Sequence, residues 1–493
     1  MNILNLSLKD LSKKLQSKEI SSTDIVNAYI NSSQIGDELN VYITKTFELA
    51  LKEAKLSDDR WAQNKQLSQF DGIPIGIKDI FLTKGIKTTN GSNFLSDFIA
   101  PFESSVTQKL KDLGYICLGK LNMDEFAMGS GNLTSYFKPV INPWMASDNK
   151  KLVPGGSSGG SSAGIASRSF VVALGTDTGG SIRQPASFSG IVGLKPTYGV
   201  CSRFGIIAFA SSLDQAGPMS RNVEDNAILL NQIAGYDEKD SSQIKFNKPD
   251  YTSKIGKDIK GLKVGLPKEY FSDKLSSQIR DYWKSTANIL EKQGAEIIDI
   301  SLPHTQYALP VYYIIAPAEA SSNLSRFDGI RYGKRASGES LEDIYLNSRT
   351  QGWGEEVKRR ILIGTYNVLT ENYDKYLQAT KVRRLITQDF INAFSKVDVI
   401  LTPTTTSSAF PIDESPNNPL EMYYNDIFTV TANLAGLPAM SIPVGLCEKS
   451  LPIGMQLIGN YHNEDELYKI SYVLESEIKF NELSTFVKQH KLF

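Results

Sequence analysis

The sequence predicts an α/β fold, because segments with strand and helix patterns alternate along much of the chain. A capped helix precedes a strand within residues 104–119, and residues 262–302 have the strand, helix, strand pattern of a βαβ unit. The same alternation returns between residues 398 and 478. At 493 residues the chain is long enough for two or three domains or for one large α/β unit.

The N-terminal part of the chain combines helices with two short strands. Residues 4–35 are expected to form two amphipathic helices, and a strand at 41–44 and a helix at 46–63 follow. The second helix is expected to begin at the capping residues Ser21, Ser22 and Thr23. The apolar run PIGI then predicts a short strand that ends at Lys78, so this lysine is expected where a strand passes into a loop.

The later elements suggest three regions. We expect an N-terminal helical region at 1–60 packed on the body, a main domain at 61–485 and a C-terminal tail at 486–493. Within the main domain, a helix is expected between a cap-like Ser220 and a terminating Gly235. The polar residues 236–260 are expected to form a surface excursion, and residues 305–397 a mainly helical insertion.

The composition predicts a cytosolic globular enzyme. Hydrophobic residues make up 41% and charged residues 22% of the chain, and the net charge of −1 gives no reason to expect direct binding to DNA or to an anionic membrane. The sequence has no apolar run of 18 residues and no pattern typical of a signal peptide. Three widely spaced cysteines without a CxxC pair argue against a disulfide framework or a zinc site.

Residues 154–183 contain two loops rich in glycine and serine, PGGSSGGS and TDTGGSIR. Hydrolysis of an amide needs an exposed nucleophile next to backbone N–H groups that stabilise the oxyanion. The second loop meets this need, because its two adjacent glycines let several amides face the Ser181 hydroxyl; a simple tight turn is the alternative interpretation. The oxyanion donors would be the amides of Thr178, Gly179, Gly180 and Ser181.

The base for such a serine is not expected to be a histidine. Only His304, His462 and His490 are present, each without a neighbouring acidic or nucleophilic motif. Lysine can replace histidine in serine hydrolases if burial lowers its pKa towards neutrality, and the apolar residues before Lys78 favour burial. A nucleophilic thiol is also not expected, because Cys117, Cys201 and Cys447 lack a glycine turn or a nearby histidine.

Three motifs in this order resemble the amidase signature family: GIPIGIKD, GGSSGGS and TDTGGSIRQPA. The resemblance implies one large domain with a mixed β-sheet flanked by helices on both faces, and a Ser-cisSer-Lys triad. By motif, Ser181 matches the nucleophile, Ser157 the bridging serine in a cis peptide after Gly156, and Lys78 the base. Asp177 and Arg183 are expected to pair and to hold the nucleophile loop, without taking part in the chemistry.

Five segments spread over nearly the whole chain, at 123–130, 194–227, 319–333, 356–369 and 422–443, are similar to the branch of the family that hydrolyses glutamine for tRNA-dependent amidotransferases. A glutamine pocket needs a cation for the α-carboxylate and an anion for the α-ammonium. The match implies Arg359 as the carboxylate ligand, Asp426 as the ammonium ligand and Tyr312 as a pocket residue, with Arg360 and Tyr313 as the alternatives one position away. Met128, Gly129 and Ser130 are further pocket candidates, whereas the following GNLTSYF departs from the usual Ser-Thr-Glu run of the family.

The same resemblance implies a heterotrimer. Ammonia from glutamine would pass to partner subunits B and C, which would bind the tRNA and use ATP and Mg to amidate Glu-tRNA(Gln), and in some organisms Asp-tRNA(Asn). No cofactor or metal is expected on this chain, which has no tRNA-reading motif.

Three other interpretations remain open. The chain could be a stand-alone amidase for another amide, or a scaffold whose loops only mediate assembly. It could also be a nucleotide-binding protein in which PGGSSGGSSAG cradles phosphate, although this loop lacks the GxxxxGK[ST] pattern.

Overall fold

One mixed β-sheet runs through the computed structural model, which describes residues 2–146, 148–271, 275–414 and 423–493. In these residues eleven strands pair in the order β1-β3-β2-β4-β6-β5-β10-β11-β9-β7-β8. Strand β2 is parallel to β3 and β4, and β7 is parallel to β8 and β9, whereas the other neighbours are antiparallel. The strands are β1 (Tyr42–Lys45), β2 (Pro74–Lys78), β3 (Ile116–Leu121), β4 (Val172–Thr176), β5 (Val192–Lys195), β6 (Ala216–Ser220), β7 (Lys263–Pro267), β8 (Glu296–Ile300), β9 (Val399–Pro403), β10 (Ala439–Leu446) and β11 (Pro452–Gly459).

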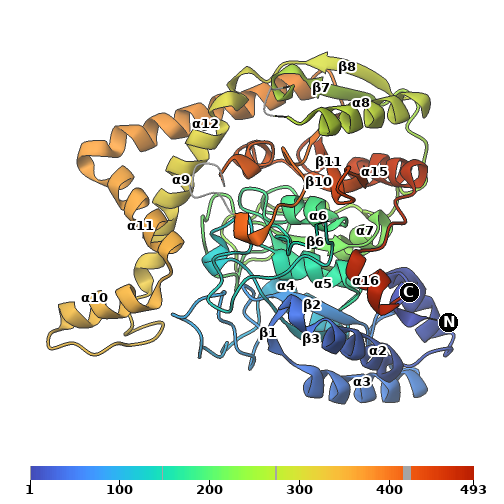
Figure 1. Cartoon of the computed structure of the whole chain (residues 1–493), viewed down its shortest axis with the longest axis horizontal. Coiled ribbons are helices and arrows are strands. Elements are labelled where there is room, and N and C mark those ends of the chain that lie inside the picture. Colours follow the sequence, from blue (N-terminus) through green and yellow to red (C-terminus); the bar gives the residue numbers. More distant parts are fainter. Residues whose placement is uncertain (1, 147, 272–274, 415–422) are drawn as a thin grey trace.

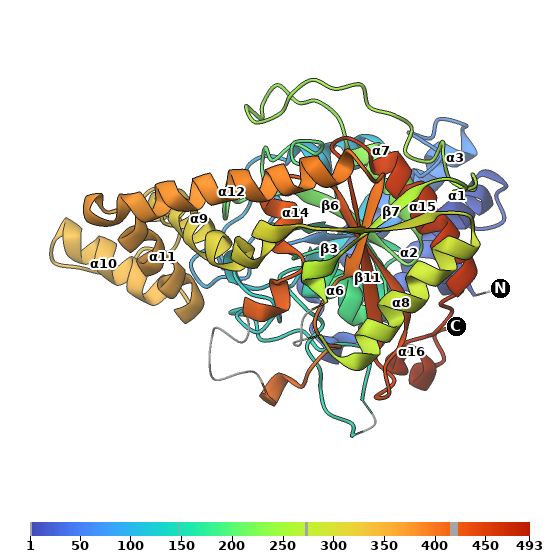
Figure 2. The same ribbon diagram turned by 90° about the horizontal axis from the view of Figure 1, so that it is seen from above.

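Helices cover both faces of this sheet, which confirms the predicted fold class. Helices α5 and α6 pack on one face of the central strands, and α7 and α15 pack on the other (Figures 1 and 2). The helices are α1 (Leu8–Gln16), α2 (Ser22–Ile35), α3 (Phe47–Ala62), α4 (Ser105–Asp112), α5 (Gly159–Ala166), α6 (Arg183–Ser189), α7 (Val223–Ile233), α8 (Ser277–Lys292), α9 (Ala308–Asn323), α10 (Leu341–Gly352), α11 (Glu355–Val368), α12 (Tyr373–Phe394), α14 (Val430–Leu434), α15 (Glu464–Ile478) and α16 (Thr485–His490).

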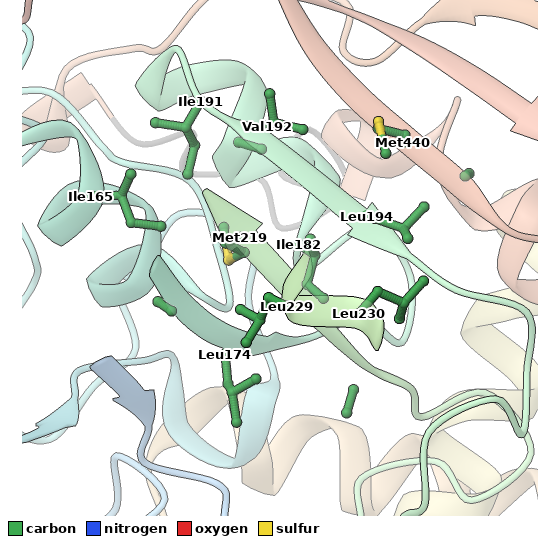
Figure 3. Packing of buried hydrophobic residues seen from close by; sticks show 14 of the residues in the cluster. Ile165, Leu174, Ile182, Ile191, Val192, Leu194, Met219, Leu229, Leu230 and Met440 are labelled. Carbon is green, nitrogen blue, oxygen red and sulfur yellow. The ribbon is translucent and has the colours of Figure 1, made fainter. Parts of the chain in front are cut away.

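The core is densest around β4, β5 and β6. Figure 3 shows Leu174 of β4 and Met219 of β6 in one cluster with Ile165 of α5 and Leu229 of α7, and all four side chains are fully buried. Complete burial of one such side chain contributes about 1.5–3 kcal/mol to folding. This packing holds the helix that follows the first glycine-rich loop firmly against the sheet.

The expected N-terminal cap of α7 was wrong by two residues, whereas the expected terminating glycine, Gly235, directly follows the C-cap. Ser220 ends strand β6, and the helix is capped by Asn222, whose side-chain oxygen accepts a hydrogen bond from the Asp225 amide at 2.7 Å. At the other end the helix stops before Ala234, so Gly235 lies one residue beyond the cap. An asparagine is a strong N-cap because its short side chain reaches the free amides of the first turn.

The region between residues 305 and 397 contains α9 to α12. Helices α10 and α11 lie well away from the sheet in both views (Figures 1 and 2). The first 60 residues contain α1, α2 and most of α3, together with β1, which pairs with β3 of the main sheet. Across the described part of the chain, no helix combines the length and the apolar character that crossing a membrane requires.

Candidate active site

Two parallel strands bring the lysine and the nucleophile loop together. Strands β2 and β4 are neighbours in register, with Ile77 opposite Leu174, so their carboxyl ends lie at the same edge of the sheet. Lys78 ends β2, and the TDTGGS segment begins at the end of β4. This edge is where parallel α/β sheets place their functional loops.

Lys78 is fully buried and surrounded by hydroxyl groups. Its Nζ lies 2.8 Å from the Oγ atoms of Ser157 and Ser158 and 2.9 Å from Oγ1 of Thr176. Burial lowers the pKa of Lys78 to about 7, although the nearby Asp124 acts in the opposite direction. The amine is therefore substantially neutral near pH 7 and able to accept a proton.

The backbone of Ser181 contacts the residue that follows Ser157. The Ser158 amide donates a hydrogen bond to the Ser181 carbonyl at 3.2 Å, so the two glycine-rich loops touch. The peptide bond between Gly156 and Ser157 is cis. Ser157 is fully buried, whereas Ser181 is 8% exposed and its hydroxyl forms no hydrogen bond with any described residue. Ser181 is thus the serine that a ligand can reach.

The amides expected to stabilise an oxyanion are not all free. The Gly180 amide donates to Oδ1 of Asp177 at 2.9 Å, so this expected donor is already occupied. Within the described residues, the amides of Thr178, Gly179 and Ser181 form no hydrogen bond. Three of the four expected amides are therefore available to a ligand.

Asp177 and Arg183 form a buried, bidentate ion pair. Nε and Nη2 of Arg183 lie 3.0 and 2.9 Å from the two carboxylate oxygens. Burial alone would raise the pKa of Asp177, but the Arg183 guanidinium outweighs it and lowers the pKa to about 2. Arg183 also binds the side chains of Asn433 and Gln456, so the nucleophile loop is tied to the C-terminal part of the chain.

The candidate pocket residues Ser130, Tyr312 and Asp426 lie close to the loops. The Ser130 hydroxyl donates to Oδ2 of Asp426 at 2.7 Å, and burial raises the pKa of Asp426 to about 7 while Ser130 and Arg360 oppose this rise. The Tyr312 ring lies against Gly179, where an added Cβ would be 2.6 Å from the hydroxyl oxygen. An acidic group and an aromatic hydroxyl therefore flank the nucleophile loop.

Arg359 and Arg360, the two candidates for the carboxylate ligand, differ in their surroundings. Arg359 points to solvent with its side chain 42% exposed and pairs with Glu356. Arg360, on the other side of α11, is buried, donates to the same glutamate at 2.8 Å and lies 5.5 Å from the centre of the Tyr313 ring. The reason is helical geometry, because adjacent residues of a helix point about 100° apart.

Met128 and Gly129 shape the loop around Asp124. An added Cβ at Gly129 would lie 2.4 Å from the Asp124 carboxylate, and the Met128 carbonyl accepts a hydrogen bond from the Thr134 hydroxyl at 3.1 Å. The unusual GNLTSYF segment is fixed by the same carboxylate, which accepts hydrogen bonds from the amides of Asn132 and Thr134.

Several residues of the site were not expected from the sequence. Gln184 accepts a hydrogen bond from the Gly156 amide at 2.9 Å and donates to the Ser130 carbonyl at 2.7 Å, so it joins the first glycine-rich loop to the pocket. Asp214 accepts from the Thr178 hydroxyl at 2.7 Å, and burial raises its pKa to about 6. Gln184 lies within the TDTGGSIRQPA motif and Asp214 within residues 194–227, one of the segments that carry the resemblance, so both had a usable signal although neither residue was named.

Two of the three cysteines have surroundings that disfavour a reactive thiolate. Burial raises the pKa of Cys117 to about 11 and that of Cys201 to about 12, so both thiols stay protonated at neutral pH. His304 pairs with Asp389 at 2.9 Å, far in sequence from the glycine-rich loops. The described residues contain no cluster of side chains suited to a metal ion.

Residues 24–468 match the sequence model of the amidase family, and the chain belongs to this family. Its relatives within the family are more specific. It is 53% identical to the A subunit of glutamyl-tRNA(Gln) amidotransferase from Pelagibacter ubique (97% of this chain, 98% of the relative). The identity to the corresponding protein of Gluconobacter oxydans is 51%, with 98% of each chain covered.

Solved structures show the same relationship. The crystal structure of the glutamyl-tRNA(Gln) amidotransferase A subunit from Thermotoga maritima is 36% identical with a TM-score of 0.80, covering 98% of this chain and 97% of that one. The peptide amidase of Stenotrophomonas maltophilia has a TM-score of 0.83 but is 28% identical, covering 98% and 99%. The fold is therefore shared across the family, whereas sequence identity favours the amidotransferase subunits.

Proposed function

We propose that the chain is a glutamine amidohydrolase that supplies ammonia for the amidation of misacylated Glu-tRNA(Gln). The observation that carries the proposal is the buried Lys78 amine, 2.8 Å from the Ser157 hydroxyl, in a loop that also contacts the backbone of the accessible Ser181. This arrangement provides a base, a proton bridge and a nucleophile without a histidine. The identity to amidotransferase A subunits supports glutamine as the amide.

In the proposed reaction, neutral Lys78 takes a proton from Ser157, which takes the proton of Ser181. The Ser181 oxygen then attacks the side-chain carbonyl of glutamine, and the amides of Thr178, Gly179 and Ser181 stabilise the negative oxygen. Lys78 returns the proton through Ser157 to the leaving nitrogen, and ammonia departs from an acyl-enzyme. Water hydrolyses this ester by the same proton path and releases glutamate.

The pocket chemistry fits the two charges of free glutamine. Arg360 would bind the α-carboxylate and Asp426 the α-ammonium, with Tyr312 against the nucleophile loop. Burial raises the pKa of Asp426 to about 7, and a bound ammonium group would favour its ionised form. An aliphatic or aryl amide carries no charges that could bind Arg360 and Asp426, which disfavours the stand-alone amidase alternative.

The amidation itself would belong to partner subunits. We infer a heterotrimer with subunits B and C in the cytoplasm, in which the partners bind the tRNA, ATP and Mg. The subunit names of the relatives support an assembly. The Asp-tRNA(Asn) reaction would use the same ammonia.

Ser181→Ala tests the nucleophile. We expect glutamine-dependent ammonia release by the purified complex to fall at least about 10³-fold, because no other oxygen occupies the attacking position. Ser325→Ala is the matched control, since this exposed hydroxyl binds only the Ser322 carbonyl. Near-normal turnover in Ser181→Ala with an unchanged melting midpoint would contradict the proposal, as would rapid hydrolysis of hydrophobic amides without any response to glutamine.

A further inference from the structure

A cavity of about 560 Å³ lies at the far ends of the helices that carry the catalytic loops. Helix α5 starts beside the Ser157 loop, and α6 starts at Arg183; the cavity is lined by Ala166 and Arg168 after α5 and by Gly190 after α6. A helix of eight residues is about 12 Å long. The cavity is therefore separate from the candidate active site. Its other walls come from the two ends of the chain, from Trp144 and from the residues just before α7.

Three cationic side chains line this cavity without a carboxylate partner. The side chain of Arg168 forms no ion pair or hydrogen bond with any described residue, and its Nε atom is completely buried. Arg221 is held in place by the carbonyl oxygens of Leu4, at 2.6 Å, and Leu6. Lys479 is exposed at the end of α15 and forms no ion pair with the described residues.

The acidic groups near the cavity do not neutralise these cations. Glu475 accepts a hydrogen bond from the Val223 amide at 2.9 Å, and burial raises its pKa to about 8, so it is largely protonated at pH 7. Glu482 pairs with Lys488 at 3.0 Å. The carboxylate of Asp225, near Arg221, accepts hydrogen bonds from the amides of Leu8 and Lys9. The cavity therefore keeps a net positive charge.

The Arg168 guanidinium is poorly stabilised as it stands. Burial and the neighbouring Arg221 lower its pKa to about 9. A buried cation without a counter-charge is unfavourable, and the ends of α5 and α6 offer it no hydrogen bond. A bound anion would supply the missing partner.

We propose that this cavity binds a small phosphate-bearing anion, as free phosphate or as a phosphate ester. Guanidinium groups match the geometry of phosphate oxygens. A doubly charged phosphate can also balance more than one cation, whereas a carboxylate carries a single negative charge. Ser476 and Asn481 add polar side chains that form no hydrogen bond within the described residues. The rings of Trp144 and Tyr472 form an apolar wall on which an organic group of an ester can pack.

Titration calorimetry with pyrophosphate and the full chain tests the site. We expect one pyrophosphate per chain, and affinity at least about tenfold weaker in Arg168→Gln. Arg335→Gln is the matched control, because Arg335 is exposed and lies outside the cavity. Lys479→Gln is a second variant, and because Lys479 is exposed the substitution should have little effect on folding. This variant should bind pyrophosphate about threefold more weakly than the native chain does.

Two further ligands separate the sources of the anion. Tighter binding of AMP than of inorganic phosphate would support a phosphate ester on the aromatic wall, and equal binding would support free phosphate. No pyrophosphate binding at 0.15 M salt would overturn the proposal. Equal affinity in the native chain and in both cavity variants would overturn it as well, as would citrate binding as tightly as pyrophosphate.

Discussion

Lys78 works in a fully buried site, so its charge depends strongly on pH. With its pKa lowered to about 7 by burial, the neutral amine dominates above pH 7 and the cation below. We therefore expect kcat at saturating glutamine to rise to a plateau above pH 7 and to fall about tenfold per pH unit well below it. Ammonia release measured between pH 5.5 and 8.5 gives this profile.

Asp426 provides an internal control for that profile. Its pKa is also raised to about 7 by burial, but its proposed task is to bind substrate, so its titration should affect KM. In Asp426→Asn the pH dependence of KM should flatten while that of kcat keeps its midpoint. A kcat independent of pH from 5.5 to 8.5 would contradict the role of Lys78 as the base.

The adjacent arginines of α11 should behave differently. Arg360→Gln removes the buried cation proposed to bind the α-carboxylate, and we expect KM for glutamine to rise about 10–100-fold. Arg359→Gln removes a solvent-exposed partner of Glu356, and its KM should change less than about twofold. Steady-state kinetics of the two variants decides the assignment, and equal effects would contradict it.

Some features of the site could be predicted from the sequence and others could not. The burial of Arg360 could have been predicted from helical spacing, because Val357, Arg360 and Gly364 share the buried side of α11. The hydrogen bond that occupies the Gly180 amide could not have been predicted, because it depends on how the Asp177 carboxylate folds back over its own loop. The hydroxyl partners of Lys78 beyond Ser157 depend in the same way on local three-dimensional geometry.

At the scale of elements, α5 depends on a very close approach to the strand ends. The Gly160 amide donates to the Asn122 carbonyl at 3.0 Å, and an added Cβ would lie 2.5 Å from that oxygen and 2.8 Å from the Val41 carbonyl. Backbone atoms cannot move aside easily. We expect Gly160→Ala to lower the free energy of unfolding by about 3 kcal/mol and to reduce activity by displacing Ser157.

Gly256→Ala is a suitable control for this variant. This glycine has a positive φ of 80° but open space around it, so the substitution should cost about 1 kcal/mol and leave activity unchanged. Urea unfolding and glutaminase assays compare the two. A Gly160→Ala variant as stable as the native chain would show that α5 can retreat from the strands.

Elements with a strong local signal were predicted well, and those set by tertiary pairing were not. The βαβ pattern of residues 262–302 became β7, α8 and β8, with the two strands parallel. The order of strands in the sheet could not be predicted, because β5 pairs with β10 across more than two hundred residues. Such pairings depend on the whole packed core, which local propensity does not describe.

At the scale of the whole molecule, Arg183 joins the two halves of the chain. It binds Asp177 in the nucleophile loop and also Asn433 and Gln456 from α14 and β11. Arg183→Gln would leave the Asp177 carboxylate buried without its counter-charge, so we expect a loss of about 3–5 kcal/mol in the free energy of unfolding at pH 7. Urea unfolding measures this loss, with Arg335→Gln as the control; a change below about 1 kcal/mol would contradict the prediction.

The loss in Arg183→Gln should also depend on pH. In the native chain the pKa of Asp177 is lowered to about 2, so the stability that its ionised form contributes is present above about pH 4 and lost as the pH falls through 2. In the variant, burial without the Arg183 charge would keep the pKa of Asp177 above its usual value. The difference between the two proteins should therefore shrink from pH 7 to pH 4.

The order of the strands also affects how the protein is made on the ribosome. Strands β1 to β6 are complete once residue 220 has been synthesised, but β7 and β8 connect to them only through β9, β11 and β10, which end at residue 459. At about 5–20 residues per second, the wait after β8 lasts roughly 10–30 s. During this interval the edges of β5 and β7 are open to wrong partners, so the nascent chain should benefit from a chaperone that covers them until the last strands arrive.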